Sequence, residues 1–280
     1  MQNFKDRVAV ITGAGGGIGS AIAENLAQRG CHLALLDINQ KALDEVKSKL
    51  ADSSVNITTH IVDVTDKNAY AATAQEVLKA HGGVNILINN AGITLQKEFN
   101  THSLEDLEWI IGINLWGVVY GCHFFKEALE EADEAHVVNL SSMAAFAGFP
   151  SQSTYCMTKK AVQGLSESLW AEWQIKGIGV TSVHPGAIRT NIIMATLEAS
   201  DNVEAAKRNN EMAMKTATAP EKAADLIVQA IAKNKKRLLI GLDAKILNFL
   251  AWIAPGFVNW AMKKIAQKIN KDMQALKASS

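Results

Sequence analysis

The sequence predicts a doubly wound α/β fold, in which helices cover both faces of a parallel β-sheet. Short apolar runs rich in β-branched residues alternate along the chain with longer segments whose apolar residues recur at helical spacing. Most of the short runs are apolar at consecutive positions, as expected for strands buried on both faces. No tandem repeat or low-complexity tract interrupts the alternation. We therefore expect a single domain over residues 1–280, with its core at about 5–241.

Seven of the short runs are predicted strands, and the segments between them are predicted helices. The helical segment after the first strand has an apolar stripe formed by Ile18, Ala21, Ile22 and Leu26. A later segment has a second stripe, formed by Ala161, Leu165, Leu169 and Trp173. The predicted strands are, in order, Arg7–Thr12, His32–Asp37, Ile57–Val62, Val84–Ile88, His136–Leu140, Gly179–Val183 and Arg237–Ile240.

The composition excludes several classes of protein. Twenty-eight basic residues balance 28 acidic ones, so we expect no chain-wide attraction to nucleic acid. The three cysteines are widely separated, which fits a reducing compartment better than a disulfide framework. Since no secretory or transit signal is visible at the N-terminus, we expect a cytoplasmic protein. No two histidines lie four residues apart, so we expect no metal site.

A glycine-rich turn follows the first predicted strand and leads directly into a helical pattern. The turn reads TGAGGGIG over Thr12–Gly19. Glycines let the backbone turn tightly and approach a pyrophosphate, which then lies at the N-terminus of the helix. An ordinary strand–helix turn is the alternative, but the position after the first strand favours a Rossmann-like dinucleotide site. The predicted cofactor-binding residues of the turn are Gly13, Gly17, Ile18 and Gly19.

Asp37, at the end of the second predicted strand, indicates which dinucleotide would bind. A carboxylate here can accept hydrogen bonds from the ribose hydroxyls of the adenosine half. It would also repel the additional phosphate of NADP, by roughly 4 kcal/mol at ~4 Å and an effective dielectric constant of ~20. No lysine or arginine in the turn or directly after Asp37 offsets this repulsion, so we expect NAD. Asp37 could instead cap the helix predicted at Asn39–Leu50, although Asn39 could also fill that role.

Polar residues end the third and fourth predicted strands as well. Asp63 and Val64 follow the third strand, and Asn89-Asn90-Ala91-Gly92 ends the fourth. Ligands of open α/β sheets bind at the carboxyl ends of the strands, so both segments are candidates for the site. Taken alone, each is only a polar strand end.

Tyr155 and Lys159 lie four residues apart on a predicted helix, so both side chains project from one face. A free phenol has a pKa near ~10 and is a poor base at neutral pH. An ammonium group at ~4 Å can favour the phenolate by about 4 kcal/mol, enough to lower that pKa by ~3 units. Ser142, at the end of the fifth strand, can hold a substrate oxygen. Asn114 lies in an apolar helix and is either a core amide or a water anchor in a proton relay.

These motifs together resemble the classical short-chain dehydrogenase/reductase family over roughly Arg7 to Ile240. The resemblance implies the strand order 3-2-1-4-5-6-7 and a catalytic tetrad of Asn114, Ser142, Tyr155 and Lys159. It also implies that Ile188 and Thr190 contact the nicotinamide end, whereas Asp63, Val64 and Asn90 line the adenosine side. Family members usually form homodimers or homotetramers through their fourth and fifth long helices. The motifs are TGxxxGIG, NNAG, Asn114, a serine 13 residues before YxxxK, and PGxxxT at Pro185–Thr190.

Two segments depart from the regular alternation. A polar, methionine-containing segment at about 190–218 is expected to be a substrate loop. The C-terminal helical extension, about 243–280, is apolar at Phe249, Trp252, Phe257 and Trp260 and then rich in lysine. We expect it to pack against the substrate loop or a partner subunit. A basic amphipathic helix can also lie on an anionic membrane surface, so peripheral membrane contact stays open.

The sequence therefore predicts an NAD-dependent enzyme that interconverts a secondary alcohol and a ketone, with Tyr155 as the acid/base. The apolar extension favours an apolar substrate, because it resembles the tails of family members that act on lipophilic alcohols. A ketoacyl carrier reductase is an alternative, but that role usually uses NADP, which Asp37 disfavours. A catalytically idle binding or regulatory member is the other alternative. Cys156 and His184 are expected to be structural.

Overall fold

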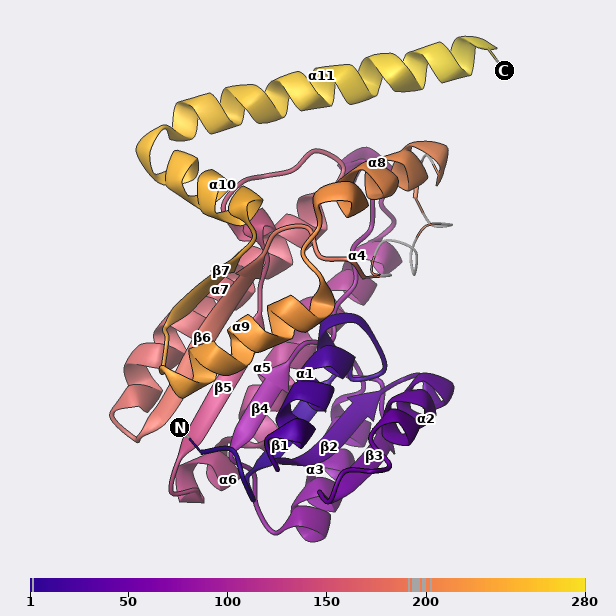
Figure 1. Cartoon of the computed structure of the whole chain (residues 1–280). Helices are drawn as coiled ribbons and strands as arrows, with labels where there is room; N and C mark the ends of the chain where they lie inside the picture. Colours follow the sequence, from indigo (N-terminus) through magenta and orange to yellow (C-terminus); the bar gives the residue numbers. More distant parts are fainter. Residues whose placement is uncertain (2, 191, 193–196, 198–199, 202, 280) are drawn as a thin grey trace.

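A seven-stranded parallel sheet with the strand order β3-β2-β1-β4-β5-β6-β7 forms the centre of the molecule (Figure 1). The computed structural model describes residues 1, 3–190, 192, 197, 200–201 and 203–279. The predicted doubly wound fold and strand order are confirmed. The strands are β1 (Val8–Thr12), β2 (His32–Asp37), β3 (Ile57–Ile61), β4 (Ile86–Asn89), β5 (Ala135–Leu140), β6 (Ile178–Pro185) and β7 (Arg237–Ile240).

Helices connect the strands, and their starts follow local sequence signals. The Asn39 side chain accepts a hydrogen bond from the backbone N–H of Ala42 and so caps α2. Pro220 occupies the first turn of α9, where its missing N–H has no intrahelical partner to lose. The helices are α1 (Gly17–Gln28), α2 (Gln40–Lys49), α3 (Lys67–His81), α4 (Leu104–Ile111), α5 (Gly117–Phe124), α6 (Lys126–Glu131), α7 (Ser153–Gln174), α8 (Val203–Thr216), α9 (Pro220–Ala232), α10 (Leu242–Ile253) and α11 (Pro255–Ser279).

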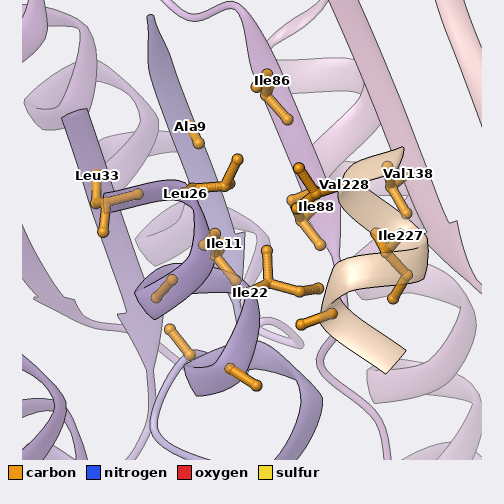
Figure 2. Close-up of a cluster of buried hydrophobic side chains, with 14 of the residues drawn as sticks. Ala9, Ile11, Ile22, Leu26, Leu33, Ile86, Ile88, Val138, Ile227 and Val228 are labelled. Carbon is orange, nitrogen blue, oxygen red and sulfur yellow. The ribbon is translucent and has the colours of Figure 1, made fainter. Parts of the chain in front are cut away.

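The consecutive apolar residues of each central strand serve two separate cores. In β1, Ala9 and Ile11 face one core, whereas Val8 and Val10 face the other. The first core lies between the sheet and helices α1, α2 and α9. Figure 2 shows its centre, where Ile22 of α1 and Ile227 of α9 lie over the strands. Both side chains are fully buried, and each contributes about 1.5–3 kcal/mol by leaving water.

The second core lies on the opposite face, under α3, α5, α6 and α7. Tyr70 of α3 and Phe125, between α5 and α6, are fully buried in it. The stripe predicted on α7 is confirmed in part, since Trp173 is buried and Leu165 and Leu169 pack partly buried against this core. Val162, one position from the predicted stripe, is fully buried.

The segment predicted as a substrate loop contains a helix, α8, and is held at both ends. Residues 191, 193–196, 198–199 and 202 of this segment lie outside the described residues. Ile188 and Thr218 form an isolated parallel bridge, in which the Thr218 N–H donates to the Ala187 carbonyl at 2.9 Å. Asp201 accepts hydrogen bonds from the backbone of Glu98 and the hydroxyl of Thr101. The described part therefore lies beside the end of β6 and the segment after β4.

The C-terminal extension forms α10 and α11, with Ala254 between them, and α11 crosses one end of the molecule (Figure 1). On α10, the buried residues Ala244 and Leu247 pack against the rest of the chain. On α11, Val258 is buried. No helix of the described residues is long and apolar enough to span a bilayer.

The expected packing of the extension against the substrate loop is wrong for its large apolar side chains. The exposed fractions of Phe249, Trp252, Phe257 and Trp260 range from 54% to 80%. The physical reason is that α10 is apolar on two faces. Leu247 lies on the face that meets the chain, and Phe249 lies on the other. Packing against a partner subunit stays a prediction.

Candidate active site

A cavity of about 610 Å³ opens at the carboxyl ends of the strands. It extends from the glycine-rich turn after β1 to the start of α7 and the loop after β6. Of the residues predicted from the sequence, those lining it are Gly13, Gly17, Ile18, Asp37, Asn90, Ser142, Tyr155, Lys159, Ile188 and Thr190.

The glycine-rich turn brings the backbone close to the cavity and to its own neighbours. Gly17 has a φ of +57°, and a Cβ there would lie 3.0 Å from the Cγ2 of Thr190. A Cβ on Gly19 would lie 2.2 Å from the Gly13 carbonyl oxygen. Gly16 precedes α1 without a side-chain cap, so the first N–H groups of the helix face the cavity end with no side-chain acceptor. This geometry suits an anionic group such as a phosphate.

Asn90 braces the glycine-rich turn against the end of β4. Its side-chain amide donates to the carbonyl oxygens of Thr12 and Gly13, both at 3.0 Å. The Thr12 hydroxyl in turn accepts hydrogen bonds from the backbone N–H groups of Asn90 and Ala91. Asn90 thus lines the cavity and also fixes the shape of the turn. The role of Thr12 as a brace had no separate signal in the sequence.

Asp37 ends β2 with its carboxylate at the cavity. One carboxylate oxygen accepts from the Gly15 N–H at 2.9 Å, and the other accepts from the Asn39 N–H at 3.0 Å. Since Asn39 caps α2, the alternative role of Asp37 as that cap is excluded. Two backbone donors hold the carboxylate in place. Among the described residues that line the cavity, Lys159 is the only lysine or arginine, and it belongs to the opposite end.

Ser142, Tyr155 and Lys159 meet on the cavity wall. Ser142 begins a 3-10 turn, Met143–Ala145, and its hydroxyl accepts from the Ala144 N–H at 3.1 Å. Tyr155 and Ser142 lie close enough on this wall for the Ser142 side chain to influence the pKa of the phenol. Lys159 is only 4% exposed, its Nζ donates to the Leu140 carbonyl at 3.0 Å, and this nitrogen lies 5.6 Å from the centre of the Tyr155 ring.

The electrostatics of this group differ from the sequence-based expectation. Burial raises the pKa of the Tyr155 phenol above its ordinary value, and the neighbouring Ser142 side chain opposes that rise. Burial also lowers the pKa of Lys159 from 10.5 to about 8. The expectation that Lys159 lowers the Tyr155 pKa is therefore wrong for the chain alone. Desolvation dominates both shifts, and the Lys159 ammonium nitrogen donates to the Leu140 carbonyl.

Asn114 lies behind the cavity wall, in a π-helical turn over Gly112–Trp116. Its side chain is fully buried and forms a two-way link with the backbone of Ile93, accepting at 2.8 Å and donating at 2.9 Å. Its amide also donates to the Thr158 hydroxyl at 3.3 Å. A Cβ on Gly92 would lie 3.2 Å from both Asn114 Oδ1 and Lys159 Nζ. These contacts fit the interpretation of Asn114 as a core amide. Through them the Asn114 side chain links the segment after β4 to α7.

The loop after β6 forms the other end of the cavity, with Ile188 and Thr190 on its wall. Asp243, the second residue of α10, also lines the cavity and accepts from the Ala187 N–H at 2.7 Å. The sequence did not predict this contact. An aspartate in the first turn of a helix is common because its charge is favourable there, so it does not indicate a contact with a distant loop.

Besides Gly19 and Asn114, two more predicted residues, Asp63 and Val64, lie away from the cavity lining. Asp63 is exposed after β3, and its carboxylate accepts from the N–H and hydroxyl of Thr65. Val64 is 7% exposed and packs against Gly117, where a Cβ would lie 2.9 Å from a Val64 methyl carbon. The structure therefore gives Asp63 a turn-forming contact and Val64 a core contact.

Cys156 and His184 have structural contacts. Burial raises the pKa of the Cys156 thiol, whose sulfur accepts from the Phe149 N–H at 3.3 Å. His184 is fully buried, stacks on Phe146, and bonds to the Ser142 carbonyl at 3.1 Å. It therefore supports the backbone that carries Ser142.

The wall beyond Tyr155 is largely apolar. Sequence reasoning missed these residues, since they come from separate segments whose apolar positions look like ordinary core positions. They are Met143, Ala144, Phe149, Ile192, Met214 and Ala217.

A family model described as short chain dehydrogenase matches residues 7–201. The chain belongs to the short-chain dehydrogenase family. SadH, an oxidoreductase of Mycobacterium tuberculosis, is 34% identical over 258 residues, which cover 90% of this chain and 92% of SadH. A relative from Anopheles gambiae, described as similar to dehydrogenase/reductase family member 7, is 28% identical and covers 96% of this chain and 86% of its own length.

Solved structures of short-chain dehydrogenases have the same fold. One from Burkholderia phymatum, in complex with NAD, has a TM-score of 0.80 and 31% identity, covering 85% of this chain and 90% of its own. One from Novosphingobium aromaticivorans has a TM-score of 0.76 and 28% identity, covering 99% of this chain and all of its own. The C-terminal extension thus falls within the range of this second match. This short-chain dehydrogenase is an oxidoreductase of that family.

Proposed function

We propose that this short-chain dehydrogenase transfers a hydride between NAD and a secondary alcohol or ketone, with Tyr155 as the general acid/base. The observation that carries the proposal is the group of Ser142, Tyr155 and Lys159 on one wall of the cavity, with the Lys159 Nζ 5.6 Å from the centre of the Tyr155 ring. A hydroxyl pair at the cavity surface, with an amine buried behind it, is the arrangement that proton exchange with a substrate oxygen requires.

The choice of NAD rests on the end of the cavity formed by the glycine-rich turn and Asp37. The Gly13–Gly19 turn and the N-terminus of α1 suit a pyrophosphate, and the Asp37 carboxylate can accept from ribose hydroxyls. Its fixed charge has no basic partner among the described lining residues, which disfavours a phosphate on that ribose. The relative from Burkholderia phymatum was solved with NAD, which supports the same choice.

In the direction of oxidation, each group of the chain has a distinct task. The Ser142 hydroxyl donates to the substrate oxygen and orients it. Tyr155 Oη accepts the hydroxyl proton while the C–H electron pair leaves as hydride, so that a C=O double bond forms. A bound NAD supplies the hydride acceptor and a positive charge that favours the phenolate. Lys159 adds its own charge when protonated, and reduction reverses every transfer.

The substrate is proposed to be apolar at the side away from the hydroxyl. Met143, Phe149 and Met214 form this part of the cavity wall, and methionine side chains adapt to ligands of different shapes. A ketoacyl carrier reductase is less favoured because of Asp37. A catalytically idle role is disfavoured because Ser142, Tyr155 and Lys159 all lie at the cavity.

The deciding experiment is a screen of secondary alcohols and ketones with purified protein, followed through the absorbance of reduced NAD. We expect turnover with NAD and its near-complete loss in Tyr155→Phe, which removes only the ionisable oxygen, with NAD binding retained. The matched control is Tyr120→Phe, since Tyr120 lies on α5 outside the cavity lining. Retention of more than about a tenth of kcat in Tyr155→Phe would assign the proton transfer to another group.

A further inference from the structure

The C-terminal extension presents large apolar side chains and lysines to solvent on both of its helices. On α10, four large apolar residues recur at spacings of four, three and four, so they share one face of the helix. They are Leu242, Ile246, Phe249 and Ile253, with exposed fractions of 72%, 49%, 55% and 50%. Trp252, beside this stripe, is 80% exposed.

The surface continues on α11 with aromatic and then basic residues. Phe257 and Trp260 are 54% and 55% exposed, and their rings stack at 5.8 Å. Lys264 lies one turn further along the helix, with its Nζ 6.0 Å from the Trp260 ring centre. Lys268 and Lys271 follow at helical spacing and are exposed. We call these α10 and α11 residues the outer face.

The opposite side of each helix meets the rest of the chain. Ala244 and Leu247 are buried on α10, and Val258 is buried on α11. The outer face is therefore left uncovered in a single chain after both helices have packed. Leaving this many large apolar side chains in water is unfavourable, and contiguous patches of this kind mark interaction surfaces.

The charge of the extension indicates the chemistry of its partner. Residues 242–280 contain six lysines and two aspartates, a formal net charge of +4 in a chain whose net charge is zero. One of the two aspartates, Asp243, is bonded to the Ala187 backbone. In a two-fold interface the same positively charged surface would lie on both copies of the chain, which is unfavourable for like charges. An anionic lipid surface instead attracts lysines and accepts tryptophan, phenylalanine and leucine at its headgroup boundary.

We propose that the outer face of α10 and α11 docks on the surface of an anionic lipid bilayer. Phe249, Trp252 and Trp260 enter the headgroup boundary, and Lys264, Lys268 and Lys271 lie against the anionic headgroups. The helices lie on the surface and do not span it. This inference goes beyond the proposed reaction and does not depend on it.

The test is co-sedimentation of the full-length protein with two kinds of vesicle, phosphatidylcholine alone and phosphatidylcholine mixed with phosphatidylserine. We expect binding to the mixed vesicles, weakened by added salt because salt screens surface charges. The variant Lys264→Gln/Lys268→Gln/Lys271→Gln should bind about 100-fold more weakly, since each lysine near an anionic surface contributes about 1 kcal/mol. The matched control, Lys41→Gln/Lys47→Gln/Lys79→Gln on exposed positions of α2 and α3, should bind like the wild type.

A second variant, Phe249→Ser/Trp252→Ser, tests the apolar part and should also lose binding, with circular dichroism confirming that it folds. Absence of wild-type binding to the phosphatidylserine vesicles would overturn the proposal. Equal weakening in both lysine variants would also overturn it, because general charge would then explain binding. A wild-type dimer that dissociates in the Phe249→Ser/Trp252→Ser variant, without vesicle binding, would assign the face to a second copy of the chain.

Discussion

The carboxylate of Asp243 accepts a hydrogen bond from the backbone N–H of Ala187 at 2.7 Å, and so joins the start of α10 to the loop after β6. Its second oxygen accepts from the Ala244 N–H at 2.9 Å. A Cβ on Gly186 would collide with this carboxylate, at 2.0 Å from Oδ1. The loop that carries Ile188 thus depends on the C-terminal extension for its position.

We predict that Asp243→Ala lowers kcat/KM by about tenfold, because a hydrogen bond to a charged group contributes about 1.5–3 kcal/mol. If Asp243 acts as a positioning residue, the KM for NAD should rise more than kcat falls, since the displaced loop lines the expected nicotinamide end. Asp243→Asn retains an acceptor and should recover most of the loss. A uniform loss of protein stability with an unchanged KM for NAD would instead make Asp243 purely structural.

The fixed carboxylate of Asp37 gives a prediction on cofactor preference. We expect kcat/KM to be at least tenfold higher with NAD than with NADP, because like charges at ~4 Å repel by roughly 4 kcal/mol at an effective dielectric constant of ~20. Asp37→Ser removes the charge and keeps an acceptor for the Gly15 N–H, so the ratio should fall towards one. Asp44→Ser, on α2, is the matched control and should leave the ratio unchanged. Equal use of the two dinucleotides by the wild type would contradict this prediction.

The lowered pKa of Lys159 makes a prediction about stability. Burial of the ammonium lowers this pKa from 10.5 to about 8 in the folded chain, whereas the unfolded chain keeps the ordinary value. Below pH 8 the folded chain therefore carries the full desolvation cost, and that cost disappears as the pH rises through the window from 8 to 10.5. A shift of one pKa unit corresponds to about 1.4 kcal/mol.

We therefore predict that Lys159→Met raises the free energy of unfolding of the cofactor-free protein at pH 7 by about 1–3 kcal/mol, while activity is lost. The gain should shrink to less than about 1 kcal/mol at pH 10, where the folded wild type has released the proton. Urea denaturation of the wild type and of Lys159→Met at both pH values measures this gain in the free energy of unfolding. Lys160→Met, at the neighbouring exposed position, should show no such pH dependence. A gain that is equal at the two pH values would mean that Lys159 is neutral at pH 7.

Most of the fold could be predicted because most of the strands are apolar at consecutive positions. Val8 to Ile11 had to be buried on both sides, and the structure gives them two cores. The strand order came from the family resemblance, since periodicity alone does not specify which strands are neighbours. Gly17, Tyr155 and Lys159 belong to sequence motifs, and their position at the cavity could therefore be predicted.

Three features could not be predicted, each for a physical reason. The pKa of Tyr155 depends on how deeply the ring is buried and on where the Lys159 ammonium bonds, and residue spacing determines neither. The contact of Asp243 with Ala187 joins residues 56 positions apart, through one side chain of an ordinary type. The exposure of Phe249 depends on which of two apolar faces of α10 packs against the chain.

His184 supports the backbone of Ser142 through a defined tautomer. The Ser142 carbonyl can only accept, so the His184 Nδ1 carries a hydrogen and donates it at 3.1 Å. Nε2 of the neutral ring then accepts from the Ser182 hydroxyl at 2.9 Å. Burial lowers the pKa of His184 from 6.5 to about 4, so the ring is neutral in the folded chain at neutral pH.

Acidification should therefore destabilise the fold through this residue. The unfolded chain binds the His184 proton below pH 6.5, whereas the folded chain resists it until about pH 4. The stabilising contribution is complete above pH 6.5 and falls by about 3 kcal/mol as the pH drops through that window.

We predict that His184→Asn, which keeps an Nδ donor for Ser142, loses stability at pH 7. Its free energy of unfolding should change less between pH 6.5 and 4 than that of the wild type. Urea denaturation across this range measures the difference, with His123→Asn, at an exposed position of α5, as the control. Parallel pH curves for wild type and His184→Asn would mean that protonation of His184 plays no part in acid unfolding.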